Sequence, residues 1–394
     1  MSTPDREMVQ KPKGSNTGMW AAVAVVLIVI VVVVVGFEAG WFGKSSTNNN
    51  GTTPPPGPCT VPSGQSITGA GSTFVYPLMY TWETDYTASS VTYSSVGSGT
   101  GISDLASKTV DFAASDAPLS PAQQATDPNV VEMPESAGAV TIIYNLPGVP
   151  TLKFNGTVLA DIYLGTITNW NSTQMQTLNP GVHLPDQSIV VVHRSDGSGT
   201  SFAFTEYLSA ESSTWKSTVS YATSVVWPTG TGEKGNGGVS GYVQQTEYTI
   251  GYVDLEYALA NGISYGSVLN PAGNYVLPSL NSTANAIKDF TGTLPAATDA
   301  KDWYNVTIEN EPGAQDYPIS TFTYLMSYQE MSTLGSSFTS QQADALISFW
   351  NWTIHTGQSY SGQLYYVPLP QNIVTSDEAE LSAFTFNGAA VSHC

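Results

Sequence analysis

The stretch that decides the fold is residues 193–204, which read HRSDGSGTSFAF. A β-branched run at 189–192 predicts a buried strand before it, and the apolar spacing from residue 202 predicts a helix after it. Glycines at 197 and 199 permit a tight turn and close approach to a ligand. Ser198 or Thr200 can cap the helix, whose free amides and positive dipole end favour an anion. Arg194 adds a forked cation that Asp196 could hold in place.

Taken alone, this stretch is equally compatible with a surface turn that carries an exposed arginine–aspartate pair. Three further segments argue for a binding site. ITGAGSTF (67–74) and SSVGSGTGISDL (94–105) also place Gly and Ser/Thr between a predicted strand and a helix start, and VDFAASDAPLS (110–120) ends a predicted strand at Asp116. Three helix starts, one arginine and one aspartate together predict a single oxyanion site.

At these residues the chain resembles the phosphate-binding proteins of ABC-type phosphate importers. The resemblance includes WPTGTGEKGNGGVSGYVQQ (227–245) and TIGYVDLEYA (249–258), and it extends in the family's order from about residue 67 to about residue 373. It implies an α/β, two-lobed periplasmic-binding-protein-like fold of type II with a cleft between the lobes. By this resemblance lobe I is 60–138 plus 319–394, and lobe II is 139–318.

The resemblance also implies which residues bind phosphate. Asp116 matches the carboxylate that accepts the ligand's proton, and Asp196 matches the acid that orients the cation; the alternative for Asp116 is a cap on a neighbouring loop. Val75 replaces the family's usual proline, and the loop at 234–237 is expected to be structural. The implied phosphate ligands are Thr73, Phe74, Ser98, Asp116, Arg194, Ser198, Gly199 and Thr200.

The pattern of strands and helices supports the same fold class. Strand patterns alternate with helical patterns from residue 67 to residue 144, and the last of these strand patterns covers 139–144. The alternation indicates an α/β fold with a largely parallel core sheet. Ligands in such folds bind at the carboxyl ends of the strands, where the Gly/Ser-rich loops fall. Further along, 158–178 and 343–354 have helical spacing, and 318–328 is typical of a strand.

The N-terminal segment has the features of a membrane anchor. Residues 20–37 form a long apolar run without a basic residue, and about 1.5 Å per residue nearly spans a hydrocarbon core of roughly 30 Å. Basic residues before this run predict a cytoplasmic N-terminus. We therefore expect a cytoplasmic tail (1–18), one transmembrane helix (19–37), a Ser/Thr/Pro-rich linker (38–59) and an extracellular binding domain at the cell membrane. A cleaved signal peptide is the alternative.

Charge and motif content argue against several other functions. With 11 Lys+Arg against 31 Asp+Glu the chain has a formal charge of -20, which argues against nucleic-acid binding. The four histidines are scattered without metal-ligand spacing, GSGTS is not a nucleophile elbow, and no P-loop lysine follows the Gly-rich turns. His193 alternates with Arg194 on a strand, so we expect a packing or surface role for it. We expect no enzymatic activity, no metal and no cofactor.

Two features bear on an exterior location. Six N-x-S/T sequons would accept glycans only in an exported chain, and they lie at Asn50, Asn155, Asn171, Asn281, Asn305 and Asn351. The two cysteines, Cys59 and Cys394, either form a disulfide or remain as free thiols, and the sequence leaves both open.

The sequence therefore predicts a membrane-tethered protein that binds inorganic phosphate outside the cell and delivers it to the permease of an ABC-type importer. The alternative is an anchored phosphatase-like or phosphate-sensing surface protein that uses the same oxyanion site. An enzyme would need a nucleophile or a metal, and turnover of a phosphomonoester would distinguish the two functions.

Overall fold

The computed structural model describes residues 61–295 and 302–394. The expected cytoplasmic tail, transmembrane helix and linker, the sequon at Asn50, and Cys59 all lie outside these residues. Among the residues that are described, no helix is long and apolar enough to cross a membrane. Residues 58–394 form one compact unit.

A mixed nine-stranded sheet, counted over the described residues, runs through this unit. One further strand, β9 (Ser264–Tyr265), pairs beside this order with β4. The order of the others is β2 (Ser90–Ser95), β1 (Ser66–Gly71), β3 (Phe112–Ser115), β12 (Ser320–Tyr328), β4 (Val130–Tyr144), β8 (Thr249–Asp254), β6 (Val190–Arg194) and β7 (Thr231–Glu233). Two small sheets are formed by β5 (Lys153–Phe154), β10 (Ser267–Leu269) and β11 (Tyr275–Val276), and by β13 (Thr385–Phe386) and β14 (Ala389–Ala390).

Strand β4 connects the two lobes. All 15 of its residues are buried. Its first part pairs with β12 as far as Ala139, and from Val140 onward it pairs with β8. The sheet therefore passes from one lobe to the other along a single strand. Lobe limits at residues 138 and 318 stay a prediction, although the change of partner in β4 lies next to the first of them.

The first half of β4 was not predicted as a strand. It contains Pro134, which has no amide hydrogen, and two glutamates, all of which are uncommon in a buried central strand. The pairing register shifts between Thr323 and Tyr324, opposite Pro134 and Ser136, so that Glu135 is the extra residue of a bulge. The bulge lets the ladder continue past the proline.

The expectation of a largely parallel sheet is wrong for the centre of the sheet. Strands β1, β2 and β3 are parallel to one another, as are β6, β7 and β8. The central strand β12 pairs antiparallel with β3 and β4, and β4 pairs antiparallel with β8. Each lobe thus has a set of parallel strands, and within a lobe the loops that follow these strands all lie at the same edge of the sheet.

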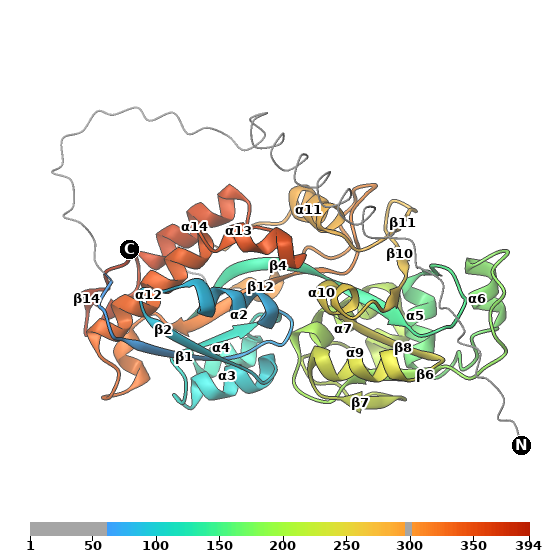
Figure 1. Ribbon diagram of the computed structural model, residues 1–394, viewed down its shortest axis with the longest axis horizontal. Coiled ribbons are helices and arrows are strands. Elements are labelled where there is room, and N and C mark those ends of the chain that lie inside the picture. Colours follow the sequence, from blue (N-terminus) through green and yellow to red (C-terminus); the bar gives the residue numbers. More distant parts are fainter. Residues whose placement is uncertain (1–60, 296–301) are drawn as a thin grey trace, which may run out of the picture. The chain divides into compact units, whose positions relative to one another are not determined.

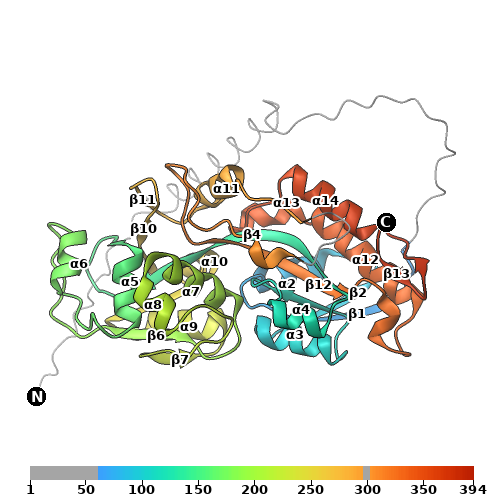
Figure 2. The same ribbon diagram turned by 180° about the vertical axis from the view of Figure 1, so that it is seen from behind.

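Helices cover both faces of the sheet in the first lobe (Figures 1 and 2). One face carries α3 (Ser98–Ala106) and α4 (Pro121–Thr126). The other carries α2 (Tyr76–Asp85), α12 (Ser340–Ile354), α13 (Gln358–Ser361) and α14 (Gln371–Leu381). The 3-10 turns η2 (Met331–Leu334) and η3 (Gly362–Leu364) belong to the same lobe.

The second lobe is arranged in the same way. Helix α9 (Gly235–Gln245) lies on the face of β8 and β6 that is seen in Figure 1, and α7 (Gly199–Glu211) with α8 (Ser213–Thr218) lies on the face seen in Figure 2. The lobe also contains α5 (Gly156–Tyr163), α6 (Thr173–Leu178), α10 (Leu255–Ala260), α11 (Leu280–Asp289) and the turn η1 (Trp303–Asn305).

The helical pattern predicted over 158–178 is two helices. Helix α5 ends at Tyr163, and Gly165 follows with a φ of +75°, a left-handed conformation that terminates helices. Helix α6 begins after Ser172, whose hydroxyl accepts a hydrogen bond from the amide of Met175. The apolar spacing is helical on both sides of Gly165, and this glycine divides the predicted helix into two.

Candidate anion-binding site

The Gly/Ser-rich loops meet between the two lobes, at the carboxyl ends of parallel strands. Strands β1, β2 and β3 lead into the loops that carry Ser72, Ser98 and Asp116, and β6 ends at Arg194. The lobes touch there: the amide of Gly99 donates to the carbonyl oxygen of Gly197 at 3.0 Å. A Cβ atom on Gly99 would lie 3.0 Å from the Cα atom of Gly197, so this close contact favours glycine.

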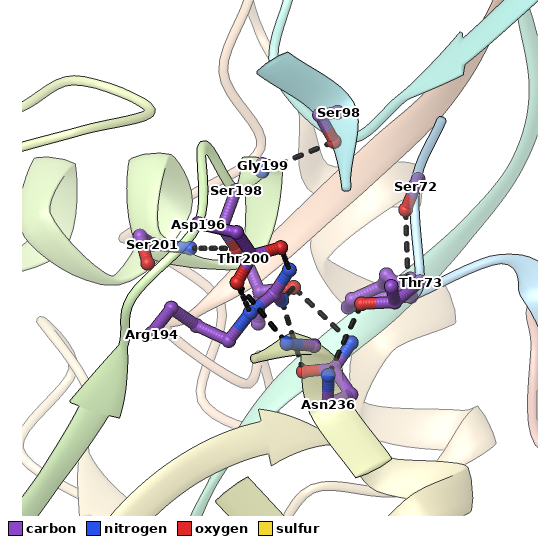
Figure 3. Close-up of polar contacts among 12 residues, drawn as sticks. Ser72, Thr73, Ser98, Arg194, Asp196, Ser198, Gly199, Thr200, Ser201 and Asn236 are labelled. Carbon is purple, nitrogen blue, oxygen red and sulfur yellow. Dashed lines mark hydrogen bonds and ion pairs between the residues drawn. The ribbon is translucent and has the colours of Figure 1, made fainter. Parts of the chain in front are cut away.

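Arg194 is the buried cation of this site. It is 2% exposed, and its Nε and Nη2 atoms donate to Oδ1 and Oδ2 of Asp196 at 2.7 and 2.5 Å. Partial burial alone would raise the pKa of Asp196, but the hydrogen bond and charge of Arg194 outweigh it and lower that pKa. The remaining arm is turned inward, where Nη1 donates to Thr200 Oγ1 at 3.3 Å (Figure 3).

Asp116 lies opposite the arginine. Its carboxylate is 1% exposed and accepts hydrogen bonds from Ser72 Oγ on one oxygen and from Thr200 Oγ1, at 3.4 Å, on the other. Burial raises the pKa of Asp116 to about 7, and the contacts with Ser72, Arg194 and Thr200 limit the rise. A carboxyl with this pKa exists in both protonation states near neutral pH.

Two helices begin at the site with their amide ends toward it. Gly97 precedes α3 with a φ of +99°, and a side chain there would collide with Asp196. Ser98 Oγ accepts from the amide of Gly199 at 3.1 Å, which joins the starts of α3 and α7 (Figure 3). Ser198 caps α7 by accepting from the amide of Ser201 at 3.0 Å, so of the two predicted caps it is Ser198 that acts.

The third helix start differs from the prediction. Helix α2 begins at Tyr76 with Val75 as its N-cap, so Thr73 and Phe74 lie in a turn before the helix. Ser72 Oγ accepts from the amides of Phe74 and Val75 at 2.9 and 3.4 Å and so closes this turn. The family's usual proline is absent at position 75, and Pro77 lies in the first turn of the helix.

The loop at 234–237 contributes to the site and is not only structural, which corrects the expectation from the sequence. Asn236 is fully buried, and its amide donates to Thr73 Oγ1 at 3.1 Å. Its side chain accepts from Arg194 Nη1 at 3.5 Å and donates to Thr200 Oγ1 at 3.3 Å (Figure 3).

The structure brings all nine predicted residues together. They are Thr73, Phe74, Ser98, Asp116, Arg194, Asp196, Ser198, Gly199 and Thr200. Sequence reasoning missed Ser72 and Asn236, although both lie inside stretches that had been singled out. Ser72 directly precedes a predicted ligand, and Asn236 lies between two glycines at the start of α9, where an uncharged amide has no distinctive sequence pattern.

The side chains that could suggest catalysis are placed elsewhere. The ring of His193 stacks on Trp227 with centroids 4.7 Å apart, so of the two roles expected for it, packing or surface, it has the packing role. Burial lowers the pKa of His193. Within residues 61–295 and 302–394, no group of three or more His, Cys, Asp or Glu side chains could hold a metal ion. Cys394 takes part in a disulfide bond, and Cys59 lies outside the described residues.

Comparison with known proteins agrees with the geometry. A model of the PBP superfamily domain matches residues 50–355. The chain is 41% identical over 318 residues to the phosphate-binding protein PstS of Xylella fastidiosa, strain 9a5c, covering 79% of this chain and 84% of that protein. It is 38% identical over 333 residues to PstS of Haemophilus influenzae, covering 82% and 94%. The chain belongs to the PstS family of phosphate-binding proteins.

Solved structures support the two-lobed fold of this PstS family member. A high-affinity periplasmic phosphate-binding protein (PfluDING), solved with phosphate bound, superposes with a TM-score of 0.65 at 22% identity, covering 80% of this chain and 93% of that chain. The phosphate-binding protein of Stenotrophomonas maltophilia gives a TM-score of 0.60 at 19% identity, with the same coverage. None of these relatives points to an enzymatic family.

Proposed function

We propose that this chain binds inorganic phosphate outside the cell and delivers it to the permease of an ABC-type phosphate importer. One observation carries the proposal: a buried cation and a buried carboxylate both contact the hydroxyl of Thr200. Arg194 Nη1 lies 3.3 Å from Thr200 Oγ1, and Asp116 Oδ2 lies 3.4 Å from it. An anion that also carries a proton suits both groups, and both hydrogen phosphate and dihydrogen phosphate have this property.

Each predicted ligand has a role in this proposal. Arg194 donates to phosphate oxygens with the arm that Asp196 leaves unused, and Asp116 accepts the phosphate proton. The amides of Phe74 and of the α7 start donate to further oxygens, with Gly199 allowing the backbone to approach. The hydroxyls that complete the set are those of Thr73, Ser98, Ser198 and Thr200.

The location outside the cell belongs to the same proposal. A single transmembrane helix at 19–37, preceded by the cytoplasmic tail 1–18 and followed by the linker 38–59, would hold the binding unit at the outer face of the membrane. We further propose lobe I as 60–138 plus 319–394 and lobe II as 139–318. Of the sequons, Asn171, Asn281 and Asn305 have exposed side chains, which supports glycan attachment there.

Calorimetry on the full chain tests the proposal. We expect tight binding of phosphate and arsenate, which both carry a proton, and weak binding of sulfate. Residues 58–394, which form one compact unit, should bind phosphate equally well. The absence of phosphate binding by both proteins would refute the function, and turnover of a phosphomonoester would favour the phosphatase-like alternative.

A further inference from the structure

Next to the site, three buried oxygen atoms lie in a row that joins the two lobes. The hydroxyl of Tyr366, in the segment before α14, lies 2.6 Å from the backbone carbonyl oxygen of Phe74. The same hydroxyl lies 2.8 Å from Oδ2 of Asp254, the last residue of β8. Tyr366 and Phe74 are fully buried, and Asp254 is 1% exposed. Phe74 is one of the proposed phosphate ligands, so this row ends in the binding loop.

The protonation state of Asp254 follows from the number of hydrogen atoms that this row of oxygens needs. Two oxygen–oxygen contacts of hydrogen-bond length need two hydrogens. Tyrosine has a single O–H, and a carbonyl oxygen can only accept. If Asp254 were ionised, Tyr366 could donate to one neighbour only. The other contact would be two acceptors in apposition, buried away from water, which is costly.

We propose that Asp254 is protonated and, with Tyr366, forms a positioning pair that fixes the Phe74 carbonyl in the binding loop. The carboxyl donates from Oδ2 to Tyr366 Oη, and Tyr366 donates to the carbonyl of Phe74. The other carboxyl oxygen, Oδ1, accepts from the amide of Glu256 at 2.9 Å, which leaves Oδ2 as the place for the proton. The effect on phosphate rests on the proposed function, but the protonation of Asp254 does not.

The groups around Asp254 favour the neutral carboxyl. Burial is the largest cause that raises the pKa of Asp254 well above its ordinary value, and the negative charges of Glu256 and Asp116 act in the same direction. Tyr366 faces it from the first lobe and Tyr257 from α10. Bound phosphate adds further negative charge near Asp116, so it must strengthen the hold on this proton.

This linkage has a definite sign. Because the phosphate-bound protein holds the proton more strongly, phosphate affinity is highest at pH values where Asp254 is already protonated before phosphate binds. The affinity declines as the pH rises through the pKa that Asp254 has in the phosphate-free protein, because binding must then take up a proton. The pair thereby couples the orientation of the Phe74 loop to a proton that the ligand never touches.

Calorimetry of the full chain with phosphate tests the pair. Tyr366→Phe removes the hydroxyl and should weaken binding about three- to tenfold, the worth of one hydrogen bond. Tyr207→Phe is the matched control, since it removes a fully buried hydroxyl that has no hydrogen-bond partner among the residues the structure describes, and it should leave phosphate affinity unchanged. Equal affinities of Tyr366→Phe and Tyr207→Phe would overturn the proposal.

Asp254→Asn separates the proton from the carboxyl. An asparagine amide can accept from the Glu256 amide and donate to Tyr366, as the protonated acid does. It should bind within about threefold of the natural protein at neutral pH, since the hydrogen-bond pattern is retained. The titrations of phosphate and of Asp116 affect both proteins alike, so they cancel in the ratio of the phosphate affinity of Asp254→Asn to that of the natural protein. This ratio should rise as the pH is raised. A large loss at neutral pH, or a ratio that does not change with pH, would contradict the proposal.

Infrared spectroscopy gives a readout that does not need phosphate. The spectrum of the full chain at neutral pH should contain a protonated-carboxyl band that Asp254→Asn removes and that Glu256→Gln retains. Loss of this band supports the proposal even if phosphate fails to bind, in which case only the proposed function is refuted. A difference spectrum without this band would show Asp254 to be ionised and would overturn the inference.

Discussion

Asp196 contacts Arg194 through two hydrogen bonds, one to each carboxylate oxygen, from Nε at 2.7 Å and from Nη2 at 2.5 Å. The two residues are separated by a single position at the end of β6, so a strand and its following turn bring them together. A forked pair of this kind restricts rotation of the guanidinium. The restriction leaves Nη1 directed at Thr200 and Asn236, with contacts of 3.3 and 3.5 Å that are long enough for an incoming oxyanion to replace.

Arg194→Ala should weaken phosphate binding more than Thr200→Ala. Hydrogen bonds to a charged group are worth about 1.5–3 kcal/mol, whereas neutral ones are worth about 1 kcal/mol. The first change should therefore cost about ten- to a hundredfold in affinity and the second about fivefold. Arg194→Lys should recover only part of the loss, because an ammonium group lacks the fork that Asp196 holds. Equal losses for the two alanine variants, measured by calorimetry, would mean that phosphate binds elsewhere.

Asn236→Ala should also weaken phosphate binding, by about three- to tenfold. The change removes the side chain that supports both Arg194 Nη1 and Thr200 Oγ1, and such neutral contacts are worth about 0.5–1.5 kcal/mol. Lys234→Ala is the control, because Lys234 is an exposed cation in the same loop. If removing this cation costs more than removing the buried amide, the loop acts through its charge and the role given to Asn236 is wrong.

A part of the chain could be predicted from the sequence where its structure is determined by residues that are adjacent in sequence. The turn at 195–200 could be predicted because strand, glycine, cap and helix are adjacent in sequence, and Ser198 caps α7 as expected. The resemblance supplied the grouping of Asp116 with Arg194, since nothing within either segment specifies that they meet. That meeting depends on the two lobes coming together, which no periodicity encodes.

The parts that could not be predicted depend on contacts between distant residues. Strand β4 was only half recognised because Pro134 is accommodated by a bulge against β12, about 190 positions later, and not by its own neighbours. Asn236 was overlooked because its importance comes from three partners on other segments. An uncharged amide beside glycines has no distinctive pattern of its own.

Glu330→Gln should destabilise the folded protein. The carboxylate of Glu330 accepts from Ser332, Thr385, Asn387 and Gly388, and so holds the hairpin of β13 and β14 against η2. A glutamine places an NH₂ group opposite some of these donors. We expect a loss of about 1 kcal/mol in the free energy of unfolding, discounted for the partial exposure of the group. Urea unfolding measures it, and Glu378→Gln, which breaks only an exposed contact with His355, should change stability less.

The contribution of Glu330 should also depend on pH. Burial acts to raise its pKa, but the hydrogen bonds from Ser332, Gly388 and Thr385 outweigh it and lower the pKa of Glu330 to about 2. A lowered folded-state pKa stabilises the protein above the unfolded value of about 4.3. The stabilisation is lost as the pH falls toward about 2. A stability difference between Glu330→Gln and the natural protein that persists unchanged at acid pH would refute this assignment.

Selectivity against sulfate should decrease in acid. Burial raises the pKa of Asp116 to about 7. Above this pH the carboxylate can only accept, so it suits phosphate and opposes sulfate, which has no proton. Below it the protonated carboxyl can donate to sulfate. Competition calorimetry should therefore find that the phosphate-to-sulfate affinity ratio falls as the pH is lowered through about 7, and a ratio that rises would contradict the assigned role.

Asp116→Asn should narrow the gap between the phosphate and sulfate affinities at pH values above about 7, where Asp116 of the natural protein is ionised. In the natural protein an ionised Asp116 and a sulfate oxygen are two buried acceptors in apposition, a mismatch that costs several kcal/mol and can discriminate by orders of magnitude. The asparagine amide can donate to a fully deprotonated oxyanion, so the variant should bind sulfate more tightly, and phosphate should lose its strong O–H contact. Its affinity ratio should also lose the pH dependence centred near 7, because no carboxyl remains to titrate. If Asp116→Asn leaves the ratio unchanged, Asp116 caps a neighbouring loop and does not accept the ligand's proton.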